Sequence, residues 1–233
     1  GERVGAIVLL RDLTDLRRRE HELLSKEATV REIHHRVKNN LQTVAALLRL
    51  QARRLPDGAG RWALDEAVRR VGTIALVHET LSHGFDETVD FDEIARRGLH
   101  AIVEVATTDV PIGSRVEGSF GRLRAEDAMS LALVISELTQ NAVEHGLRET
   151  GGTVTLWVER VEEDGGDGDV LQVAIEDDGT GIPAGFRPGK AGLGTQIVNS
   201  LVQGLRGAIR WEDAQPHGTR VRFFARLRPL DPA

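Results

Sequence analysis

Two adjacent histidines stand in the segment IHHRVKNNLQ, inside a stretch whose composition favours a helix. Because a helix turns by about 100° per residue, His34 lies on the apolar seam of that helix and His35 lies at its edge. Glu32 and Asn39, three and four positions away, share the face of His35. A neutral imidazole is a nucleophile at physiological pH, and a neighbouring carboxylate can orient it and take its other proton. The segment therefore predicts a nucleophilic His35; the plain alternative is a solvated charged face.

A second polar stripe occurs in ISELTQNAVEHG, within a helix predicted over residues 125–146. Glu137, Asn141 and His145 recur there every four residues, while the other faces of the helix carry aliphatic side chains. A carboxylate, an amide oxygen and an imidazole in line suit a hydrated Mg²⁺ that holds phosphates, because Mg²⁺ prefers few protein oxygens and several waters. The stripe alone is a weak signal, since every amphipathic helix has a polar side.

Glycines follow at two points where a loop can approach a ligand. In IEDDGTGIP an apolar strand ends in two acids, and Gly179 and Gly181 come next, where the backbone can take angles that other residues avoid. In GLGTQIV, Gly192 and Gly194 directly precede a helix, whose first NH groups and dipole favour phosphate. Each pattern alone is common in turns. The order is specific: an asparagine-bearing helix, an acid with glycines, glycines before a helix, and a Gly-Thr before a final strand.

A helical hairpin is expected to carry the histidines. Residues 12–55 contain neither Pro nor Gly and predict one long helix, and residues 61–82 predict a second. Such a hairpin is too thin to bury a core alone, so we expect two copies to form a dimeric four-helix bundle. The packing seams are expected at Val30, His34, Val37, Leu41, Val44, Leu48, Gln51 and Leu55, and at Ala67, Val71, Ile74, His78 and Leu81.

After a polar break at residues 84–88, helix and strand patterns mix, as in an α+β domain of about 140 residues. Helices are predicted near residues 91–107 and 125–146 and up to residue 202. Strands are predicted near residues 115–120, 153–162, 170–177, 208–213 and 219–227. An apolar run at residues 4–10 reads as the last strand of a domain upstream, so the chain, which has no initiator Met, looks like an excised fragment.

The composition excludes several classes of function. A formal net charge of -6 gives the surface no general attraction for nucleic acid or anionic lipid, so neither is expected as a partner. The absence of cysteine removes disulfides and Cys-based metal sites and fits a reducing compartment. No apolar run approaches the roughly 18 residues of a membrane helix, and we expect a cytoplasmic protein.

The ordered set of an asparagine helix, an Asp-Gly strand end and a glycine-rich helix start resembles the ATP-binding domain of the GHKL superfamily. This superfamily includes histidine kinases, Hsp90-like chaperones, type II topoisomerases and MutL-type repair proteins. The resemblance implies an ATP-binding sandwich in which Asn141 binds Mg²⁺ beside Glu137, and Asp177 accepts the adenine amino group. The other nucleotide-site residues it implies are Gly179, Gly181, Gly192 and Gly194 in the nucleotide boxes and lid, and Thr219 near adenine. The polar stripe adds His145 as a further nucleotide-site candidate.

The segment EIHHRVKNNLQ resembles the phosphoacceptor helix of the HWE-related subfamily of histidine kinases, in which the histidine preceding Arg is phosphorylated. That residue is His35. Arg36 stands where an acid commonly follows the histidine, so we expect Glu32 to be the activating base, with Asn39 beside it. The preceding RDLT resembles the end of a PAS sensor domain, with its motif at Asp12 and Thr14.

These resemblances divide the chain into the C-terminal end of a PAS-like domain (1–13), a signalling helix with a dimerisation and phosphotransfer hairpin (14–83), and an ATP-binding catalytic domain (88–229). They imply a two-component sensor kinase core that phosphorylates His35 from Mg²⁺-ATP and passes the group to an aspartate of a response regulator receiver domain. An upstream sensor and a homodimer are implied partners. Three alternatives stay open: a nucleotide-binding scaffold without kinase activity, an anti-sigma-factor type serine kinase, and a monomeric assembly.

Overall fold

The computed structural model describes residues 14–81, 88–106, 110–161, 169–188 and 192–230, without the side chains of residues 14–28, 30, 31, 34 and 81. The expected opening strand and Asp12 lie outside this part of the chain, and so does the side chain of His34. The PAS-like end at residues 1–13 therefore stays a prediction.

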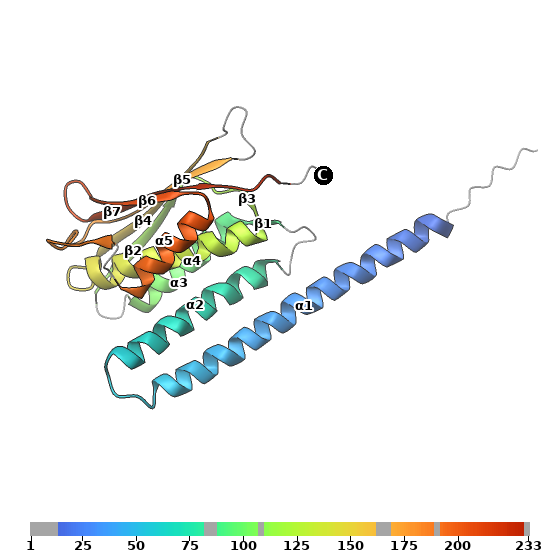
Figure 1. The fold of residues 1–233 in the computed structure, drawn as a ribbon, viewed down its shortest axis with the longest axis horizontal. Helices are drawn as coiled ribbons and strands as arrows, with labels where there is room; N and C mark the ends of the chain where they lie inside the picture. Colours follow the sequence, from blue (N-terminus) through green and yellow to red (C-terminus); the bar gives the residue numbers. More distant parts are fainter. Residues whose placement is uncertain (1–13, 82–87, 107–109, 162–168, 189–191, 231–233) are drawn as a thin grey trace, which may run out of the picture.

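Two long helices, α1 (Thr14–Ala52) and α2 (Ala59–Leu81), run antiparallel and form the hairpin (Figure 1). Within α1 no residue removes a backbone donor or strongly favours another conformation, so the helix continues for 39 residues. It ends before Pro56 and Gly58, and Gly58 takes a φ of 157° that other residues rarely adopt. Both predicted helices are confirmed, with their ends within three residues of the expected positions.

The interface between α1 and α2 is rotated from the predicted seam. Ala45 and Ala52 are buried, whereas Val44 and Leu55 are 44% and 41% exposed and Gln51 is exposed. Small alanine side chains let the two helix backbones approach closely, so the contact follows them rather than the larger neighbours. The predicted seam is therefore wrong in part: Val37, Leu41 and Leu48 are half-buried as expected, but the contact is rotated by about 50° around α1 from the predicted line. The rotation leaves an uncovered apolar stripe on α1.

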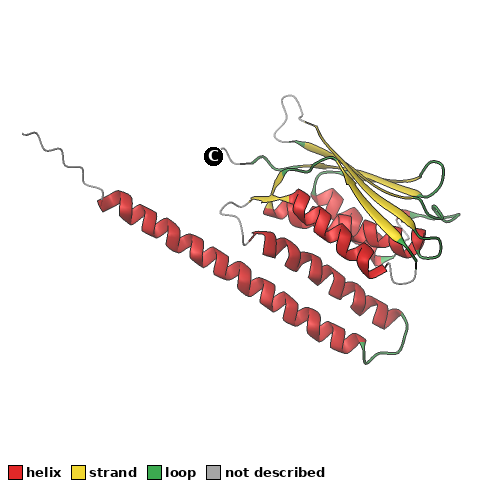
Figure 2. Ribbon diagram, turned by 180° about the vertical axis from the view of Figure 1, so that it is seen from behind, coloured by secondary structure: helices red, strands yellow, loops and turns green. Residues whose placement is uncertain are grey.

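The rest of the chain forms a mixed five-stranded sheet with helices on one face (Figures 1 and 2). Its elements are β1 (Thr88–Asp90), α3 (Phe91–Ala106), β2 (Ile112–Glu117), β3 (Arg122–Arg124), α4 (Ala125–Asn141), a π-helical turn η1 (Ala142–Leu147), β4 (Gly152–Val161), β5 (Val170–Asp177), α5 (Leu193–Gly204), β6 (Ala208–Asp213) and β7 (Thr219–Arg226). The strand order is β2-β4-β5-β7-β6, and β1 pairs separately with β3. The β2–β4 pair is parallel and the other pairs of the sheet are antiparallel. The predicted combination of a helical hairpin with an α+β domain is confirmed.

The core lies between the sheet and α3, α4 and α5, because alternate strand residues point toward these helices. Phe91 and Phe120 are fully buried there, with ring centroids 4.8 Å apart in an edge-to-face arrangement. Val77 of α2 is fully buried in the same core. Helix α2 therefore lies between α1 and the α+β domain and packs on both (Figure 1).

Three details differ from the predicted elements. β2 begins and ends three residues early, because Gly118 takes a φ of 91° and turns the chain after Glu117. The three-residue strands β1 and β3 were missed, since a strand this short carries no periodicity. α4 ends at Asn141 and continues as η1, instead of one regular helix to residue 146. Among the described helices, none is both long and apolar enough to cross a membrane.

Candidate functional site

A cavity of about 350 Å³ opens between α4, η1, the loop after β5 and the start of α5. Larger hollows lie over the outer face of the sheet and between α2 and α3, but neither is lined by a predicted site residue. The cavity beside α4 brings together eight of the predicted residues: Glu137, Asn141, His145, Asp177, Gly181, Gly192, Gly194 and Thr219.

Asp177, the last residue of β5, lines this cavity with only 3% of its surface exposed. Its Oδ1 atom accepts hydrogen bonds from the backbone NH groups of Gly179 at 3.0 Å and Thr219 at 3.2 Å. Burial raises the pKa of Asp177 above its ordinary value, and these hydrogen bonds partly offset that effect. A carboxylate has about four lone-pair sites. Asp177 is therefore a fixed acceptor with capacity left for an amino group of a ligand.

Two glycines allow the chain to close around Asp177. A Cβ atom on Gly146 would lie 2.6 Å from Oδ1 of Asp177, and one on Gly179 would lie 2.1 Å from the carbonyl oxygen of Gly146. The same carbonyl accepts a 3.1 Å hydrogen bond from the backbone NH of Thr180. The wide η1 turn thus lies directly against the loop after β5, and any side chain at these glycines would displace the buried acceptor.

The start of α5 also lines the cavity, through Gly192, Gly194 and Thr195. Gly192 is the N-cap residue and supplies no side chain to cap the helix, and the first turn contains no acid. Since the first NH groups of a helix have no partner within it, they and the helix dipole favour a phosphate. Gly194 keeps this end open, because a Cβ there would lie 2.7 Å from Oε2 of Glu137.

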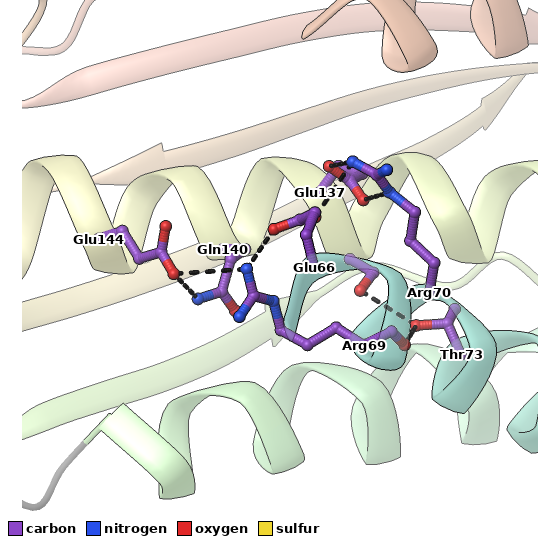
Figure 3. Close-up of polar contacts among 8 residues, drawn as sticks. Glu66, Arg69, Arg70, Thr73, Glu137, Gln140 and Glu144 are labelled. Carbon is purple, nitrogen blue, oxygen red and sulfur yellow. Dashed lines mark hydrogen bonds and ion pairs between the residues drawn. The ribbon is translucent and has the colours of Figure 1, made fainter. Parts of the chain in front are cut away.

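Glu137 is held by an ion pair from the hairpin rather than facing the cavity freely (Figure 3). Arg70 of α2 donates from Nε to Oε1 of Glu137 at 2.6 Å and from Nη2 to Oε2 at 3.1 Å. The same Nη2 atom lies 3.1 Å from Oε1 of Glu66, also on α2. Glu137 and Glu66 are only 6% and 5% exposed. One guanidinium therefore serves two buried carboxylates across the boundary between the hairpin and the α+β domain.

Further polar contacts surround this ion pair (Figure 3). Arg69 pairs with Glu66 and lies 3.6 Å from the carboxylate of Glu144, which also accepts a 2.5 Å hydrogen bond from Gln140. Thr73 of α2 and Ser136 of α4 share a hydrogen bond of 3.1 Å between their hydroxyl oxygens. Beside the cavity, α2 and α4 are thus joined by ion pairs and hydrogen bonds between particular side chains.

The predicted metal ligands fit a magnesium ion only in part. Asn141 is half-buried at the end of α4 and lines the cavity, so its amide oxygen can reach a cation there. Glu137 can do so only after Arg70 releases it. His145 lines the cavity but is exposed, and no group of three or more His, Cys, Asp or Glu side chains in the described ranges forms a metal site. A cation here would thus depend on Asn141, water and phosphate oxygens.

The predicted acceptor lies on α1, away from the cavity. His35, Glu32 and Asn39 are all exposed. Glu32 accepts a 2.7 Å hydrogen bond from Nε of Arg36 instead of bonding His35, and this contact lowers the pKa of Glu32. Its predicted hydrogen bond to the imidazole is therefore absent from this pose, because the guanidinium one turn along the helix attracts the carboxylate more strongly than a neutral ring.

The separation between acceptor and cavity follows from the alignment of the hairpin. Nζ of Lys38 lies 2.8 Å from the carboxylate of Glu79 on α2. Glu66, which lines the cavity, lies thirteen positions earlier on α2. At a rise of 1.5 Å per residue these points are about 20 Å apart along the helix axis. His35 precedes Lys38 and so lies still farther from the cavity, which makes this a pose without phosphoryl transfer.

Sequence reasoning missed several residues of the cavity. Trp62 and Glu66 reach it from α2, which was expected to contact only other hairpin helices. Phe186 and Trp211 form part of its wall, with ring centroids 6.4 Å apart. The two aromatic side chains offer a flat apolar surface for a ring such as a nucleobase. Of these residues, Trp211 was the one that the sequence pattern could have indicated, because it stands at an inward position of a predicted strand.

Comparison with known proteins agrees with this geometry. Residues 32–106 match a family of histidine kinases, and residues 126–229 match the family of histidine kinase-, DNA gyrase B-, and HSP90-like ATPases. The sensor histidine kinase PdtaS of Mycobacterium tuberculosis is 49% identical over 95% of this chain and 44% of its own length. PdtaS of Mycolicibacterium smegmatis is 48% identical over the same shares. The chain thus spans less than half the length of these relatives.

A solved structure extends the likeness to the fold. The histidine kinase domain of the Erythrobacter litoralis EL346 blue-light activated histidine kinase has a TM-score of 0.62 and 27% identity, covering 89% of this chain and 96% of that one. The blue-light-activated histidine kinase 2 of the same species is 29% identical over 75% of this chain and 50% of its own length. The chain therefore belongs to the histidine kinases: it joins a histidine-bearing hairpin of the HWE-related type to a GHKL-type ATPase domain.

Proposed function

We propose that this chain is the core of a two-component sensor kinase in which His35 accepts the γ-phosphoryl group of Mg²⁺-bound ATP. The observation that carries the proposal is the cavity at Asp177, where a buried acceptor, an uncapped helix start and an amide oxygen meet. These three features match the adenine, the phosphates and the cation of a metal-bound nucleotide in that order. An exposed histidine on a separate helix supplies the acceptor.

Adenine is assigned to the Asp177 end of the cavity. The carboxylate accepts the hydrogen bond of the exocyclic amino group, while Gly179 and Thr219 hold the carboxylate in place. Phe186 and Trp211 lie along the same cavity and cover the apolar faces of the base. The triphosphate then extends toward the first NH groups of α5.

Bound Mg²⁺ would neutralise charge on the phosphates and orient the γ-phosphoryl group. Asn141 would hold the cation through its amide oxygen. Glu137 lies one helical turn before Asn141 and becomes available to this end of the site when Arg70 leaves it. In this reading Glu137 has a catalytic role only in a pose that differs from the docked one.

In the transfer step, a ring nitrogen of His35 forms a bond to the γ-phosphorus as the bond to the β,γ-bridging oxygen breaks and ADP leaves. The proton on the second ring nitrogen is held by the carboxylate of Glu32. Both Glu32 and Arg36 are largely exposed, and an exposed ion pair is weak, so the carboxylate can turn from Arg36 to the imidazole. Asn39 shares the same face and can hydrogen-bond the ring or a phosphate oxygen.

The reaction requires the α+β domain to move along the hairpin by a distance of the order of the 20 Å estimated above. The phosphoryl group then passes from His35 to an aspartate of a response regulator receiver domain. An upstream sensor domain would act through α1, because this 39-residue helix extends from the N-terminal side of the hairpin to its turn. The proposed location is the cytoplasm, with neither nucleic acid nor membrane as a partner.

A homodimer through α1 completes the hairpin. Ile33, Val44 and Leu47 are 52%, 44% and 56% exposed, and they lie within about 60° of one another around the helix. His35 lies on the opposite side of α1 from this stripe, so it stays accessible when a second copy covers the stripe. Two stripes facing each other give the four-helix bundle that a thin hairpin needs.

Incubation with labelled ATP and Mg²⁺ tests the proposal. The wild type should gain a label that acid removes, because phosphohistidine is labile in acid. His35→Ala should retain nucleotide binding without gaining the label, and Asn141→Ala should lose the label through the nucleotide site. A label that survives acid and persists in His35→Ala would favour a serine kinase, and nucleotide binding without any label would favour a scaffold.

A further inference from the structure

An ion pair at the contact between the hairpin and the α+β domain lies in the cavity assigned to the nucleotide. Arg70 of α2 holds both oxygens of Glu137, at 2.6 and 3.1 Å, and its Nη2 also lies 3.1 Å from Glu66. Both acids are nearly buried and Arg70 is 17% exposed. We call these three residues the clasp. An ion pair buried at a mobile boundary is held firmly while it is formed, because separating the partners leaves buried charges without compensation.

The clasp and the phosphates compete for the same space. A Cβ atom added to Gly194, at the start of α5, would lie 2.7 Å from Oε2 of Glu137 and 3.9 Å from Nη2 of Arg70. The guanidinium therefore lies against the helix start that offers its NH groups to phosphate. A cation accompanying the phosphates would approach Glu137 from this side, where Arg70 already provides the positive charge.

Helix α2 also narrows the cavity. Trp62 and Glu66 belong to α2 and line the cavity together with Asn141 and Asp177. As long as α2 stays docked, the side chains of Trp62 and Glu66 occupy part of the wall along which a nucleotide would lie. His35 is meanwhile well beyond reach of the cavity along the same hairpin. The docked pose thus opposes both nucleotide binding and transfer, and the clasp stabilises that pose.

We propose that Arg70 is a positioning residue that competes with Mg²⁺-bound nucleotide for Glu137, so that docking of the hairpin and binding of nucleotide oppose each other. The proposal rests on the assignment of the cavity to Mg²⁺-ATP. By linkage, the effect is reciprocal: nucleotide releases α2, and any input that pulls α2 away raises nucleotide affinity by the same factor. Through the clasp, a signal that moves α2 would change how much nucleotide is bound in the cavity.

Nucleotide affinity of an Arg70→Gln variant provides the first test, with the Mg²⁺ complex of a non-hydrolysable ATP analogue as the probe. The expected result is binding at least about threefold tighter than in the wild type. Arg61→Gln is the matched control, because Arg61 is on the same helix and its ion pairs within the described residues are to Asp57 and Asp65, both in the hairpin. Unchanged or weaker binding in Arg70→Gln would overturn the proposal. If Arg70→Gln folds poorly, a Glu66→Gln/Arg70→Gln double variant, which keeps the net charge, replaces it in the same binding measurement, with the same expected and contradicting results.

Hydrogen exchange gives a readout without catalysis. In the wild type the amides of α2 should exchange faster when the analogue is added, and in Arg70→Gln they should exchange fast from the start. Slower exchange of α2 on nucleotide binding would mean that nucleotide strengthens docking, and the proposal would be wrong.

A disulfide lock isolates the docked pose. The chain has no cysteine, and the hydroxyl oxygens of Thr73 and Ser136 are 3.1 Å apart across the α2–α4 contact. In a Thr73→Cys/Ser136→Cys protein, oxidation should lower affinity for the analogue at least severalfold and reduction should restore it. Equal affinity in both redox states, with the disulfide verified by mass, would contradict the clasp. If instead even the reduced protein and the wild type bind no nucleotide, the assignment of the cavity fails and not the clasp alone.

Discussion

Nε of Arg70 on the hairpin helix α2 lies 2.6 Å from Oε1 of Glu137 on α4, although the residues are 67 positions apart in the chain. The second helix of the hairpin is therefore joined to the α+β domain at Glu137, a residue that lines the cavity. Glu137 therefore takes part both in the docking of α2 on the α+β domain and in lining the cavity, so a change at this side chain affects both.

The pKa values of Arg70 and Glu137 are both raised, but for different reasons. Its hydrogen bond to Glu137 raises the pKa of Arg70, which indicates a favourable contact for the cation. The pKa of Glu137 is also raised, by burial and by the nearby Glu66, although Arg70 opposes the shift. For Glu137 the cost of burying the charged carboxylate outweighs the contact with Arg70, whereas for Arg70 the same contact outweighs burial.

Asp177→Asn should weaken nucleotide binding while the fold persists. The asparagine Oδ1 can still accept from Gly179 and Thr219, but its amide NH₂ then faces the adenine amino group, donor against donor. An unpaired buried donor costs about 2 kcal/mol, which corresponds to a loss of affinity of roughly 30-fold. Calorimetric titration with Mg²⁺-ADP measures it, and an affinity equal to that of the wild type would remove adenine from this end of the cavity.

The same substitution should change the dependence of stability on pH. Because burial raises the pKa of Asp177, the folded protein holds this proton more tightly than the unfolded chain, and ionisation costs stability as pH rises through the raised value. Asp177→Asn should therefore gain stability relative to the wild type near neutral pH, and the gain should vanish at low pH. Urea unfolding between about pH 4 and pH 8 tests the sign. A wild type that becomes relatively more stable as pH rises would contradict the shift.

Gly146→Ala should destroy the nucleotide site. The new Cβ would lie 2.6 Å from Oδ1 of Asp177, so the carboxylate or η1 has to move. We expect a loss of about 2 kcal/mol in stability and no measurable nucleotide binding. Gly72→Ala on α2 is the control: it meets no atom within 4 Å, and in a helix interior alanine should add about 0.5–1 kcal/mol. Denaturant unfolding and nucleotide titration of both variants make the comparison.

Glu32→Gln should slow autophosphorylation by about 10- to 100-fold without changing nucleotide affinity, because it removes the base that holds the imidazole proton. Arg36→Gln frees Glu32 from its present partner and should leave the rate equal or higher. The control is Glu104→Gln, an exposed glutamate that is likewise about one helical turn from a histidine, His100. Single-turnover labelling measures these rates. An unaffected rate in Glu32→Gln would assign the base elsewhere.

Leu47→Glu should dissociate the proposed dimer. Leu47 is 56% exposed on the uncovered stripe of α1, and a charge there cannot be buried against a second copy. Val105→Glu on α3, at a site that is 78% exposed, is the control and should leave the mass unchanged. Sedimentation equilibrium gives the assembly mass, and a monomeric wild type would remove the four-helix bundle from the account.

The sequence alone predicted the hairpin and most strands because their signals are local. A stretch without Pro or Gly predicts α1, and the apolar run before Asp177 predicts β5, whose ends were correct. The order of asparagine, aspartate and glycines also predicted which residues meet in the cavity. Each pattern alone is common in turns and helices, so the resemblance of the ordered set to the GHKL superfamily carried this part of the prediction.

The contribution of α2 to the site could not be predicted in the same way. The spacing of Glu66 and Arg70 looks like an ordinary i, i+4 pair on a solvated helix face, and only the docked arrangement brings them to Glu137. The buried alanines of α1 were missed for a related reason. Periodicity ranks large apolar residues first, whereas close helix approach selects small ones.

The most direct test of the central claim is mass spectrometry of the intact protein after incubation with ATP and Mg²⁺, followed by fragmentation under neutral conditions. A single added phosphoryl group is expected on the imidazole of His35, lost in acid and absent from His35→Ala and Asn141→Ala. A phosphoryl group on another side chain, or none in a preparation that binds Mg²⁺-ATP and carries its sensor domain, would contradict it.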